Sequence, residues 1–427
     1  MTELRELFED ATQAPPPSRL LADEVYAAGR RRLRRRRAAL GGSALAVAVC
    51  AMAATVVVAG TGTGPGPSPE DGAATAAPRT SPGVLPGSGR IQMIQAADAG
   101  HIYLGLSTCT AGPCKTRVQL VGSADGGRTW TERGTPIHLA HFAALAPDVL
   151  LGYVLPAPPS SVPPKLMASR DGGRSWQAPE TGPAVPALPS GSFAVCWPDP
   201  DADPGGVMPA GTTLCTLRAF DPESNRVSPL VTQPGQNLAD QQPIAESAGR
   251  LWAPGFERGT GRSAVATSPD GGRTWTEHVF ADAPACPVDG CLAPLVAVGP
   301  GQVTYAVLNG ASERAVYRYT SGQGWQRRTG VQQVPYELSD TGSYVTPDGS
   351  HVLYQYVENR GASEFGEYEF WASRGAGADY RPVELDGLPE RSGRVSRARD
   401  GWLYARGTDD VSYGSTDGWH WVPLNRR

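Results

Sequence analysis

The chain has 427 residues, with 38 Lys or Arg and 42 Asp or Glu, and its formal net charge is -4. This mild charge, with no Lys or Arg patch outside one N-terminal run, argues against a nucleic-acid partner. The 52 glycines and 40 prolines indicate many turns and short elements, yet they are too few for a low-complexity chain.

The first 37 residues are expected to form a cytoplasmic head, partly helical and with an Arg-rich end. Leu4, Leu7 and Phe8 mark one short amphipathic helix, and the prolines at 15–17 separate it from a second. Seven arginines then lie within residues 30–37. The composition is typical of a tail that sets membrane topology, and contact with a cytoplasmic regulator is the alternative.

Residues 38–60 are expected to form a transmembrane helix. They contain no charged side chain, and 23 such residues can span a bilayer. Because the arginines precede this segment, the positive-inside rule places the N-terminus in the cytoplasm and the C-terminal part outside. An uncleaved single-pass anchor is favoured, since the apolar region of a cleaved signal peptide is usually about 7–15 residues long. Residues 61–89, rich in Pro, Gly, Ala and Thr, are predicted to be a linker.

One eight-residue motif occurs three times in the remaining residues, 90–427. Its Asp can accept hydrogen bonds from its own turn, its glycines permit positive φ, and its Trp provides an apolar anchor for packing. The residues concerned are Ser123, Asp125, Gly127 and Trp130, then Ser169, Asp171, Gly173 and Trp176, then Ser268, Asp270, Gly272 and Trp275. A degraded copy keeps Ser415, Asp417 and Trp421.

The spacing of the closing aromatic residues predicts the architecture. They stand at positions 130, 176, 275, 325, 380 and 421, and the interval of 99 between 176 and 275 is two periods. A unit without the motif is therefore expected around residues 218–231. Dividing 338 residues by seven gives units of about 48, and each unit fits a four-stranded blade. We predict an all-β fold, a seven-bladed β-propeller of antiparallel blades, with six or eight blades as alternatives.

Six cysteines lie beyond the membrane segment, and an even number in an exported domain indicates disulfides. Their close spacing favours sequential pairing, which joins Cys109 to Cys114, Cys196 to Cys215 and Cys286 to Cys291. A zinc site is the weaker alternative, because the spacings differ from those of a zinc knuckle and no His stands nearby in the required pattern. Neither a metal nor another cofactor is expected.

These residues resemble the Asp-box, or bacterial neuraminidase repeat, family of β-propellers. The family pattern Ser-x-Asp-x-Gly-x-x-Trp is matched in full at 123–130, 169–176 and 268–275, and the likeness covers residues 90–427. The resemblance implies that each box is a structural turn at the blade periphery, away from the central ligand face. The family includes sialidases, receptor ectodomains and exported proteins without assigned activity, so the fold does not select the function.

An enzyme and a binding module remain alternatives. A sialidase of this family would carry a Phe/Tyr-Arg-Ile-Pro segment before the first box, and Arg90 and Ile91 match it without the aromatic residue and the proline. Tyr368 with Glu367 or Glu369 would suit a nucleophile and a base, but the alternating run around them is typical of a strand. The catalytic residues are therefore unknown, and an exo-sialidase-like glycoside hydrolase is the less favoured function.

The favoured function is a membrane-anchored extracytoplasmic propeller that binds or senses a protein, a glycan or a cell-wall component. Signalling through the cytoplasmic head is a further alternative. The best candidate contact surface is the excursion between Cys196 and Cys215, because it is long and carries an aromatic residue. It contains Trp197, Asp199, Asp201 and Asp203, which match a calcium loop only in part.

Overall fold

The computed structural model divides the chain into two compact units, Met1–Ala76 and Ala77–Arg427. The structure describes residues 82–107, 117–155, 165–198, 214–239, 244–247, 249–283, 293–310, 313–335, 341–357, 367–389, 392–407 and 410–426, all in the second unit. Within these ranges no helix has the length and apolar character needed to cross a membrane. The predicted cytoplasmic head and membrane helix lie outside the described residues.

The described residues form β-strands with very little helix, which confirms the predicted all-β class. Two short 3-10 helices also occur among them, η2 (Pro300–Gln302) and η3 (Gly330–Gln333). The strands are short because glycine- and proline-rich turns interrupt them at close intervals.

The first sheet contains two groups of strands that share one long strand. Its order is β2 (Arg90–Ala96), β3 (Ile102–Ser107), β4 (Arg117–Ser123), β5 (Thr131–Ala146), β6 (Val149–Val154) and β7 (Lys165–Ser169). The N-terminal half of β5 pairs with β4, and its C-terminal half pairs with β6. One strand therefore connects two neighbouring groups without an intervening loop.

The next sheet also joins two groups. The first comprises β8 (Glu180–Thr181), β9 (Phe193–Pro198), β10 (Leu214–Asp221) and β11 (Arg226–Pro229), followed by β12 (Asn237–Ala239). The second comprises β13 (Ala245–Ser247), β14 (Arg250–Phe256), β15 (Ser263–Ser268) and β16 (Thr276–Val279). β12 pairs with both β10 and β14 and so connects the groups. β8 pairs in parallel with β11, on the opposite side from β10.

Three regular four-stranded antiparallel sheets follow. The first has β17 (Leu295–Val298), β18 (Thr304–Asn309), β19 (Arg314–Thr320) and β20 (Gly324–Arg328). The second has β21 (Thr341–Val345), β22 (His351–Val357), β23 (Glu367–Ser373) and β24 (Arg381–Val383). The third has β25 (Ser392–Arg397), β26 (Leu403–Gly407), β27 (Ser412–Ser415) and β28 (Val422–Pro423).

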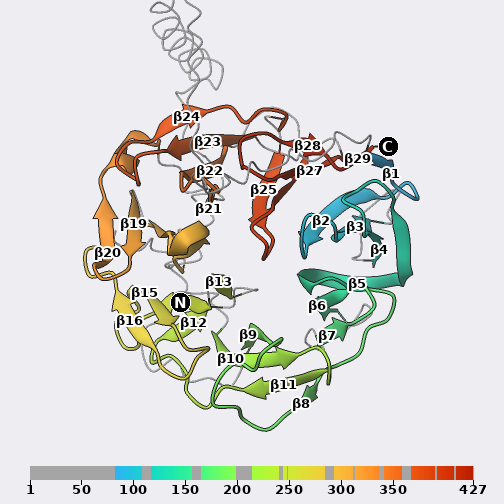
Figure 1. Ribbon diagram of the computed structural model, residues 1–427, viewed down its shortest axis with the longest axis horizontal. Coiled ribbons are helices and arrows are strands. Elements are labelled where there is room, and N and C mark those ends of the chain that lie inside the picture. Colours follow the sequence, from blue (N-terminus) through green and yellow to red (C-terminus); the bar gives the residue numbers. More distant parts are fainter. Residues whose placement is uncertain are drawn as a thin grey trace, which may run out of the picture. The chain divides into compact units, whose positions relative to one another are not determined.

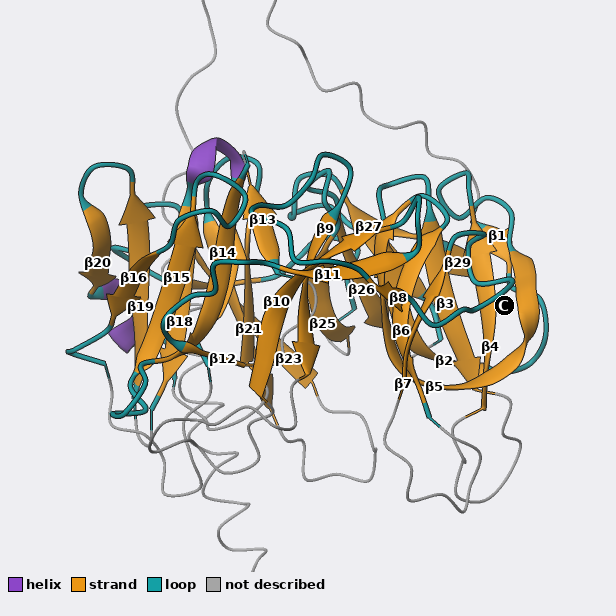
Figure 2. Cartoon of the chain, turned by 90° about the horizontal axis from the view of Figure 1, so that it is seen from below, coloured by secondary structure: helices purple, strands orange, loops and turns teal. Residues whose placement is uncertain are grey.

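The sheets of this unit follow one another around a ring, the arrangement of a β-propeller (Figure 1). Seen from the side, most strands run roughly along the axis of the ring, and their connections gather at its two faces (Figure 2). The last sheet meets the first, because β26 lies against β2. In the described sheets the strands left at an outer edge, such as β20, β24 and β28, are two to five residues long, so the edges open to pairing with another chain are short.

The hydrophobic core lies between neighbouring sheets. Trp252 of β14 and Val265 of β15, both 0% exposed, pack in one cluster with Ala306, Ala315 and Tyr317 of the following sheet. This sheet therefore buries both faces at β15, which explains why all six residues of that strand are buried and have small side chains. The seams between sheets carry most of the apolar burial that stabilises the ring.

The two ends of the described unit meet. β1 (Gly83–Val84) pairs in parallel with β29 (Asn425–Arg426), and Leu85 is buried against Trp130 and Leu424. The predicted linker boundary at residue 89 is therefore wrong, since residues 83–85 belong to the folded unit. A Pro- and Gly-rich composition does not preclude such a short strand when a partner strand satisfies its backbone groups.

Candidate functional site

The three full motifs form turns, here called box turns and defined by residues 123–130, 169–176 and 268–275. They follow β4, β7 and β15 and lead into the next antiparallel segment of the same group. In every box turn the Ser hydroxyl donates to the Asp carboxylate over 2.8 Å. The backbone N–H of the second glycine donates to the same hydroxyl over 2.7–2.8 Å. The polar side chains of a box turn thus bind the turn itself.

A hydroxyl residue just before each closing Trp completes the turn, and sequence reasoning missed it. The backbone N–H and the hydroxyl of Thr129 donate to the two carboxylate oxygens of Asp125 over 2.9 and 2.7 Å. The same pair of bonds joins Ser175 to Asp171 and Thr274 to Asp270. A signal was present, because this position is Thr or Ser in all three copies.

These hydrogen bonds keep the box carboxylates ionised. The backbone N–H and the hydroxyl of Thr274 lower the pKa of Asp270 to about 2. Partial burial opposes this effect at Asp171, but the hydrogen bonds from Ser175 and Ser169 outweigh it and lower the pKa of Asp171. A carboxylate held in this way is a poor general acid, because it does not carry a proton near neutral pH.

We expect Asp171→Ala to reduce the free energy of unfolding by about 1–3 kcal/mol, because it leaves the N–H groups of the second box turn without their acceptor. Chemical denaturation of the full-length protein in detergent measures this change. Asp171→Asn keeps one acceptor oxygen and should cost less. Equal stability of Asp171→Ala and the wild type would contradict a structural role for this carboxylate.

The box turns also hold the seams between sheets. A Cβ on Gly127 would lie 2.3 Å from the carbonyl oxygen of Leu424, and the φ of Gly127 is 86°, so only glycine fits there. Trp130 is 8% exposed, and its indole N–H donates to the same carbonyl over 3.3 Å. The indole N–H of Trp275 donates to the carbonyl of Thr232 over 3.1 Å. Trp130 and Trp275 thus join the first and third box turns to the preceding group of strands.

The degraded copy between β27 and β28 keeps part of this geometry. The hydroxyl of Ser415 donates to the Asp417 carboxylate over 3.1 Å, and the N–H of Gly418 donates to Ser415 over 2.8 Å. The hydrogen bond with the Asp417 carboxylate raises the pKa of the exposed His420. Trp421 is 4% exposed and packs in the core cluster of the last two sheets.

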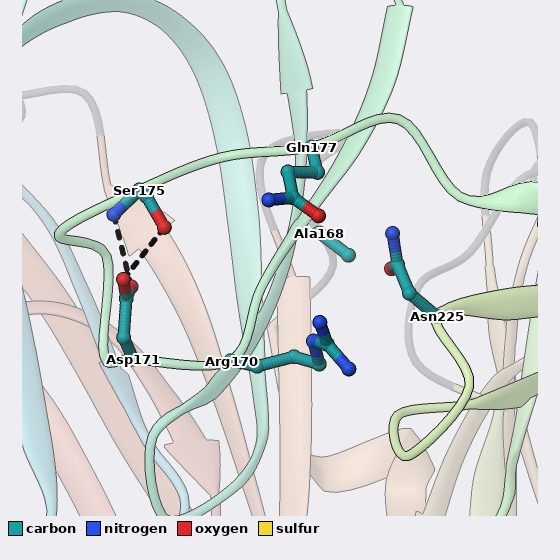
Figure 3. A pocket seen from close by; sticks show the side chains of 6 residues that line it. All are labelled: Ala168, Arg170, Asp171, Ser175, Gln177 and Asn225. Carbon is teal, nitrogen blue, oxygen red and sulfur yellow. Dashed lines mark hydrogen bonds between the residues drawn. The ribbon is translucent and has the colours of Figure 1, made fainter.

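A cavity of about 350 Å³ lies beside the second box turn (Figure 3). We call it the seam pocket, because one wall comes from the second box turn and the strand pair around it, and the other from the β10–β11 turn. Its lining residues are Ala168, Arg170, Asp171, Ser175, Gln177 and Asn225. The side chains of Arg170, Gln177 and Asn225 lie around one space next to Ala168, and the bonded Asp171–Ser175 pair lies to one side (Figure 3).

Backbone geometry positions the polar groups of the seam pocket. The Arg170 guanidinium donates to the carbonyl of Glu223 over 2.8 Å, which ties the second box turn to the β10–β11 turn. Asn225 has a φ of 54°, a conformation that Asn adopts more readily than most residues. Its amide nitrogen donates to the carbonyl of Ala178 over 3.4 Å. Gln177 is held by two backbone hydrogen bonds with Ala168, of 2.8 and 2.9 Å.

One polar atom of the seam pocket has no partner. Asn225 is 8% exposed, and its Oδ1 accepts no hydrogen bond from the described residues. A buried carbonyl oxygen without a donor costs about 1–3 kcal/mol. A ligand that donates a hydrogen bond there would remove this cost.

The seam pocket is equipped for binding. Arg170 and Gln177 offer N–H donors, and Asn225 and Gln177 offer amide oxygens. Asp171 is the one carboxylate among the described lining residues, and its own turn occupies both of its oxygens. Glycoside hydrolysis usually needs two carboxyl groups on opposite sides of the bond, and the described lining residues supply one.

The predicted contact surface between Cys196 and Cys215 lies only partly in the described residues. A disulfide joins the two cysteines, with their Cα atoms 5.4 Å apart. Trp197 lies in strand β9 and not in a loop, because its backbone pairs with β10, and the Arg218 guanidinium lies 4.9 Å from its ring. Asp199, Asp201 and Asp203 lie outside the described residues, as do Cys109, Cys114, Cys286 and Cys291.

The residues considered as a nucleophile and a base for glycoside hydrolysis lie in a β-strand. Tyr368 and Glu369 lie in β23, opposite Tyr356 and Gln355 of β22, as the alternating pattern predicted. The Tyr368 ring contacts that of Tyr356 at 5.7 Å between centroids. Across the described ranges, no three His, Cys, Asp or Glu side chains are grouped so as to hold a metal ion.

Neither a protein-family model nor a curated protein sequence matches the chain. Several solved β-propeller structures are similar to it at low identity. A GH74 xyloglucanase from Xanthomonas campestris is 16% identical over 79% of this chain and 47% of its own, with a TM-score of 0.34. The β-propeller domain of the Trilobed protease from Pyrococcus furiosus is 9% identical over 79% of this chain and 98% of its own, with a TM-score of 0.42.

A Penicillium chrysogenum α-L-arabinanase, solved with arabinobiose, is 14% identical over 78% of this chain and 94% of its own, with a TM-score of 0.38. The chain spans about half the length of the xyloglucanase and 65% of a second GH74 enzyme, from Niastella koreensis. At these identities no activity or ligand is transferred, and the likeness concerns the fold alone.

Proposed function

We propose that the protein is a membrane-anchored, extracytoplasmic β-propeller that binds a glycan or a glycan-containing cell-wall component. The observation that carries this proposal is the seam pocket, where a guanidinium and two amides surround a cavity of about 350 Å³. Pockets for small ligands combine a concave space of this order with a few well-placed polar groups. The hydroxyl groups of a sugar both donate and accept hydrogen bonds, so they can pair with the amide oxygens and with the N–H donors of this lining.

Seven blades are the proposed architecture. The strands divide into seven groups: β2 to the first half of β5, the second half of β5 to β7, β8 to β11, β13 to β16, β17 to β20, β21 to β24, and β25 to β28. β10 and β11 lie in the unit that the interval of two periods predicted without a box motif. This grouping supports the seven-blade count over six or eight.

The membrane anchor and the exported location are part of the proposal. The arginines at 30–37 and the uncharged residues 38–60 support them, and so does the Cys196–Cys215 disulfide, which is typical of an oxidising compartment. Protease treatment of intact cells provides the test. We expect loss of the C-terminal unit from the outside, and complete protection of that unit would contradict an extracytoplasmic location.

Binding is tested with the full-length protein in detergent micelles on an array of neutral and acidic glycans. Retention of a defined subset of glycans is the expected result, and retention of none would contradict the proposal. Fluorogenic sialosides and other aryl glycosides test the alternative in the same preparation. Turnover that is abolished by replacing a single carboxylate would show that the protein is a glycosidase.

A further inference from the structure

The β10–β11 turn ends in a residue that differs from those of the box turns. Trp130 and Trp275 directly precede the first paired residues of β5 and β16. Asn225 directly precedes Arg226, the first paired residue of β11. Asn225 thus ends its turn next to the outgoing strand, as the closing tryptophans do, but its turn comprises residues 222–225 only, whereas a box turn has eight residues.

Asn225 also keeps the hydrogen bond that this position makes. The indole N–H groups of Trp130 and Trp275 donate to backbone carbonyls of the preceding group of strands. The amide nitrogen of Asn225 donates to the carbonyl of Ala178, which likewise belongs to the segment that follows the preceding group. The polar contact is preserved while the indole ring is absent.

The seam pocket lies beside this shorter turn, which presents an amide where the box turns present an indole. An amide fills much less of a seam than an indole, and the cavity of about 350 Å³ lies against Asn225. Arg170, Ser175 and Gln177 are exposed and Asn225 is buried, so the seam pocket is open to solvent on one side and reaches a buried amide on the other.

A second seam shows an aromatic ring beneath the corresponding arginine. Ser373 begins a further degraded copy of the motif, and Arg374 follows Ser373 as Arg170 follows Ser169. The Arg374 guanidinium lies 5.0 Å from the ring centroid of Trp419, which stands two residues before the closing Trp421 in the β27–β28 turn. The space next to Arg374 therefore receives a flat ring from the protein, whereas the space next to Arg170 is open.

Charge and hydrogen bonding restrict the class of ligand that the seam pocket can bind. The Arg170 guanidinium disfavours a cation, and the ionised Asp171 carboxylate in the same wall disfavours an anion. The unpartnered Oδ1 of Asn225 requires a donor, which a hydroxyl group provides. A neutral ring that carries several hydroxyl groups satisfies all three conditions.

We infer that the seam pocket binds one ring of a neutral sugar between Arg170, Gln177 and Asn225. A sugar hydroxyl donates to Asn225 Oδ1, and other hydroxyl oxygens accept from Arg170 and Gln177. This inference rests on the proposed glycan-binding function and names its site and its ligand class.

Saturation-transfer NMR and calorimetric titration of the full-length protein in detergent provide the test. The probes are the methyl glycosides of glucose, galactose and mannose, together with N-acetylglucosamine, and N-acetylneuraminic acid serves as the acidic probe. We expect at least one neutral probe to bind and the acidic probe not to bind. Binding of the acidic probe alone would overturn the assignment of a neutral ligand.

Two variants remove the polar groups of the seam pocket. Asn225→Gly deletes the amide and tolerates the positive φ, and Arg170→Met deletes the guanidinium at similar length. Each should weaken binding of the neutral probe by about tenfold or more, the effect of losing one hydrogen bond to a buried polar group. The matched control is Arg374→Met, which alters the same motif position at the filled seam and should bind as the wild type does.

The experiments distinguish an error in the proposed site from an error in the proposed glycan-binding function. Wild-type affinity in both Asn225→Gly and Arg170→Met, with glycans still retained on the array, would overturn the seam pocket as the site and leave glycan binding intact. Absence of binding to every glycan and every probe would overturn both proposals. Thermal unfolding of each variant establishes that it is folded, and Arg170→Met decides the question if Asn225→Gly does not fold.

Discussion

Lowering the pH from 7 to 5 is expected to destabilise the propeller by about 2 kcal/mol through one histidine. His351 in β22 is 0% exposed, and burial lowers its pKa to about 3. Its ring stacks on Tyr305 with 4.0 Å between centroids, and its Nδ1 lies 2.6 Å from the Tyr380 hydroxyl. The native protein therefore holds this imidazole neutral at pH values where the unfolded chain protonates it.

The sign follows from the two pKa values of His351. In the unfolded chain an imidazole titrates near pH 6.5, and in the native state the pKa of His351 is about 3. Between these values the unfolded state binds one more proton, so stability falls by about 1.4 kcal/mol for each pH unit of acidification. Above pH 6.5 both states are neutral, and this contribution to the pH dependence disappears.

Urea denaturation of the wild type and of His351→Gln at pH 7, 6 and 5 measures this effect. Gln does not titrate and keeps a polar partner for Tyr380, so His351→Gln should lose less stability on acidification than the wild type. The difference between the two slopes isolates His351 from the other histidines. Parallel pH profiles for the two proteins would show that this imidazole is protonated or solvated in the native state.

Trp130→Ala should destabilise the propeller by about 3–5 kcal/mol, the typical cost of removing a large buried aromatic side chain. Trp130 packs with Leu85 near the N-terminal end of the described unit and with Leu424 near the C-terminal end. Its indole N–H also donates to the carbonyls of Gly127 and Leu424. One side chain thus supports the seam at which the first and last sheets meet.

Chemical unfolding of Trp130→Ala and Trp130→Phe separates packing from hydrogen bonding at this seam. Trp130→Phe keeps most of the apolar ring and loses the N–H, so we expect it to cost less than Trp130→Ala. A loss of less than about 1 kcal/mol in Trp130→Ala would resemble the effect of a surface substitution. It would show that the stability of the propeller does not depend on this seam.

The box turns were predictable because their interactions are local. Ser123 and Asp125 bond to backbone groups no more than four residues away. A repeat in the sequence therefore becomes a repeat in the structure without help from the rest of the fold. The same counting of intervals located the unit without the motif, where β10 and β11 lie.

The seam pocket was not predictable, because no local pattern marks Asn225. An Asn before a short strand is an ordinary turn residue, and its significance appears only when its buried Oδ1 is seen to line a pocket with Arg170 and Gln177. Arg170 likewise reads as a solvated turn residue until the β10–β11 turn is placed beside it. The linker boundary failed for a related reason, since the partner of Gly83 is Asn425, far along the chain.

The sequence by itself determined the strand class, the turn chemistry and the period of this protein, because glycine conformation, side-chain capping and alternation act over a few residues. Tertiary structure decided which turns meet across the seams, where the ends of the unit pair and which seam holds a pocket. Those features depend on packing between sheets, where a contact joins residues that are tens to hundreds of positions apart. A pocket lined by two turns exists only once both turns are in place.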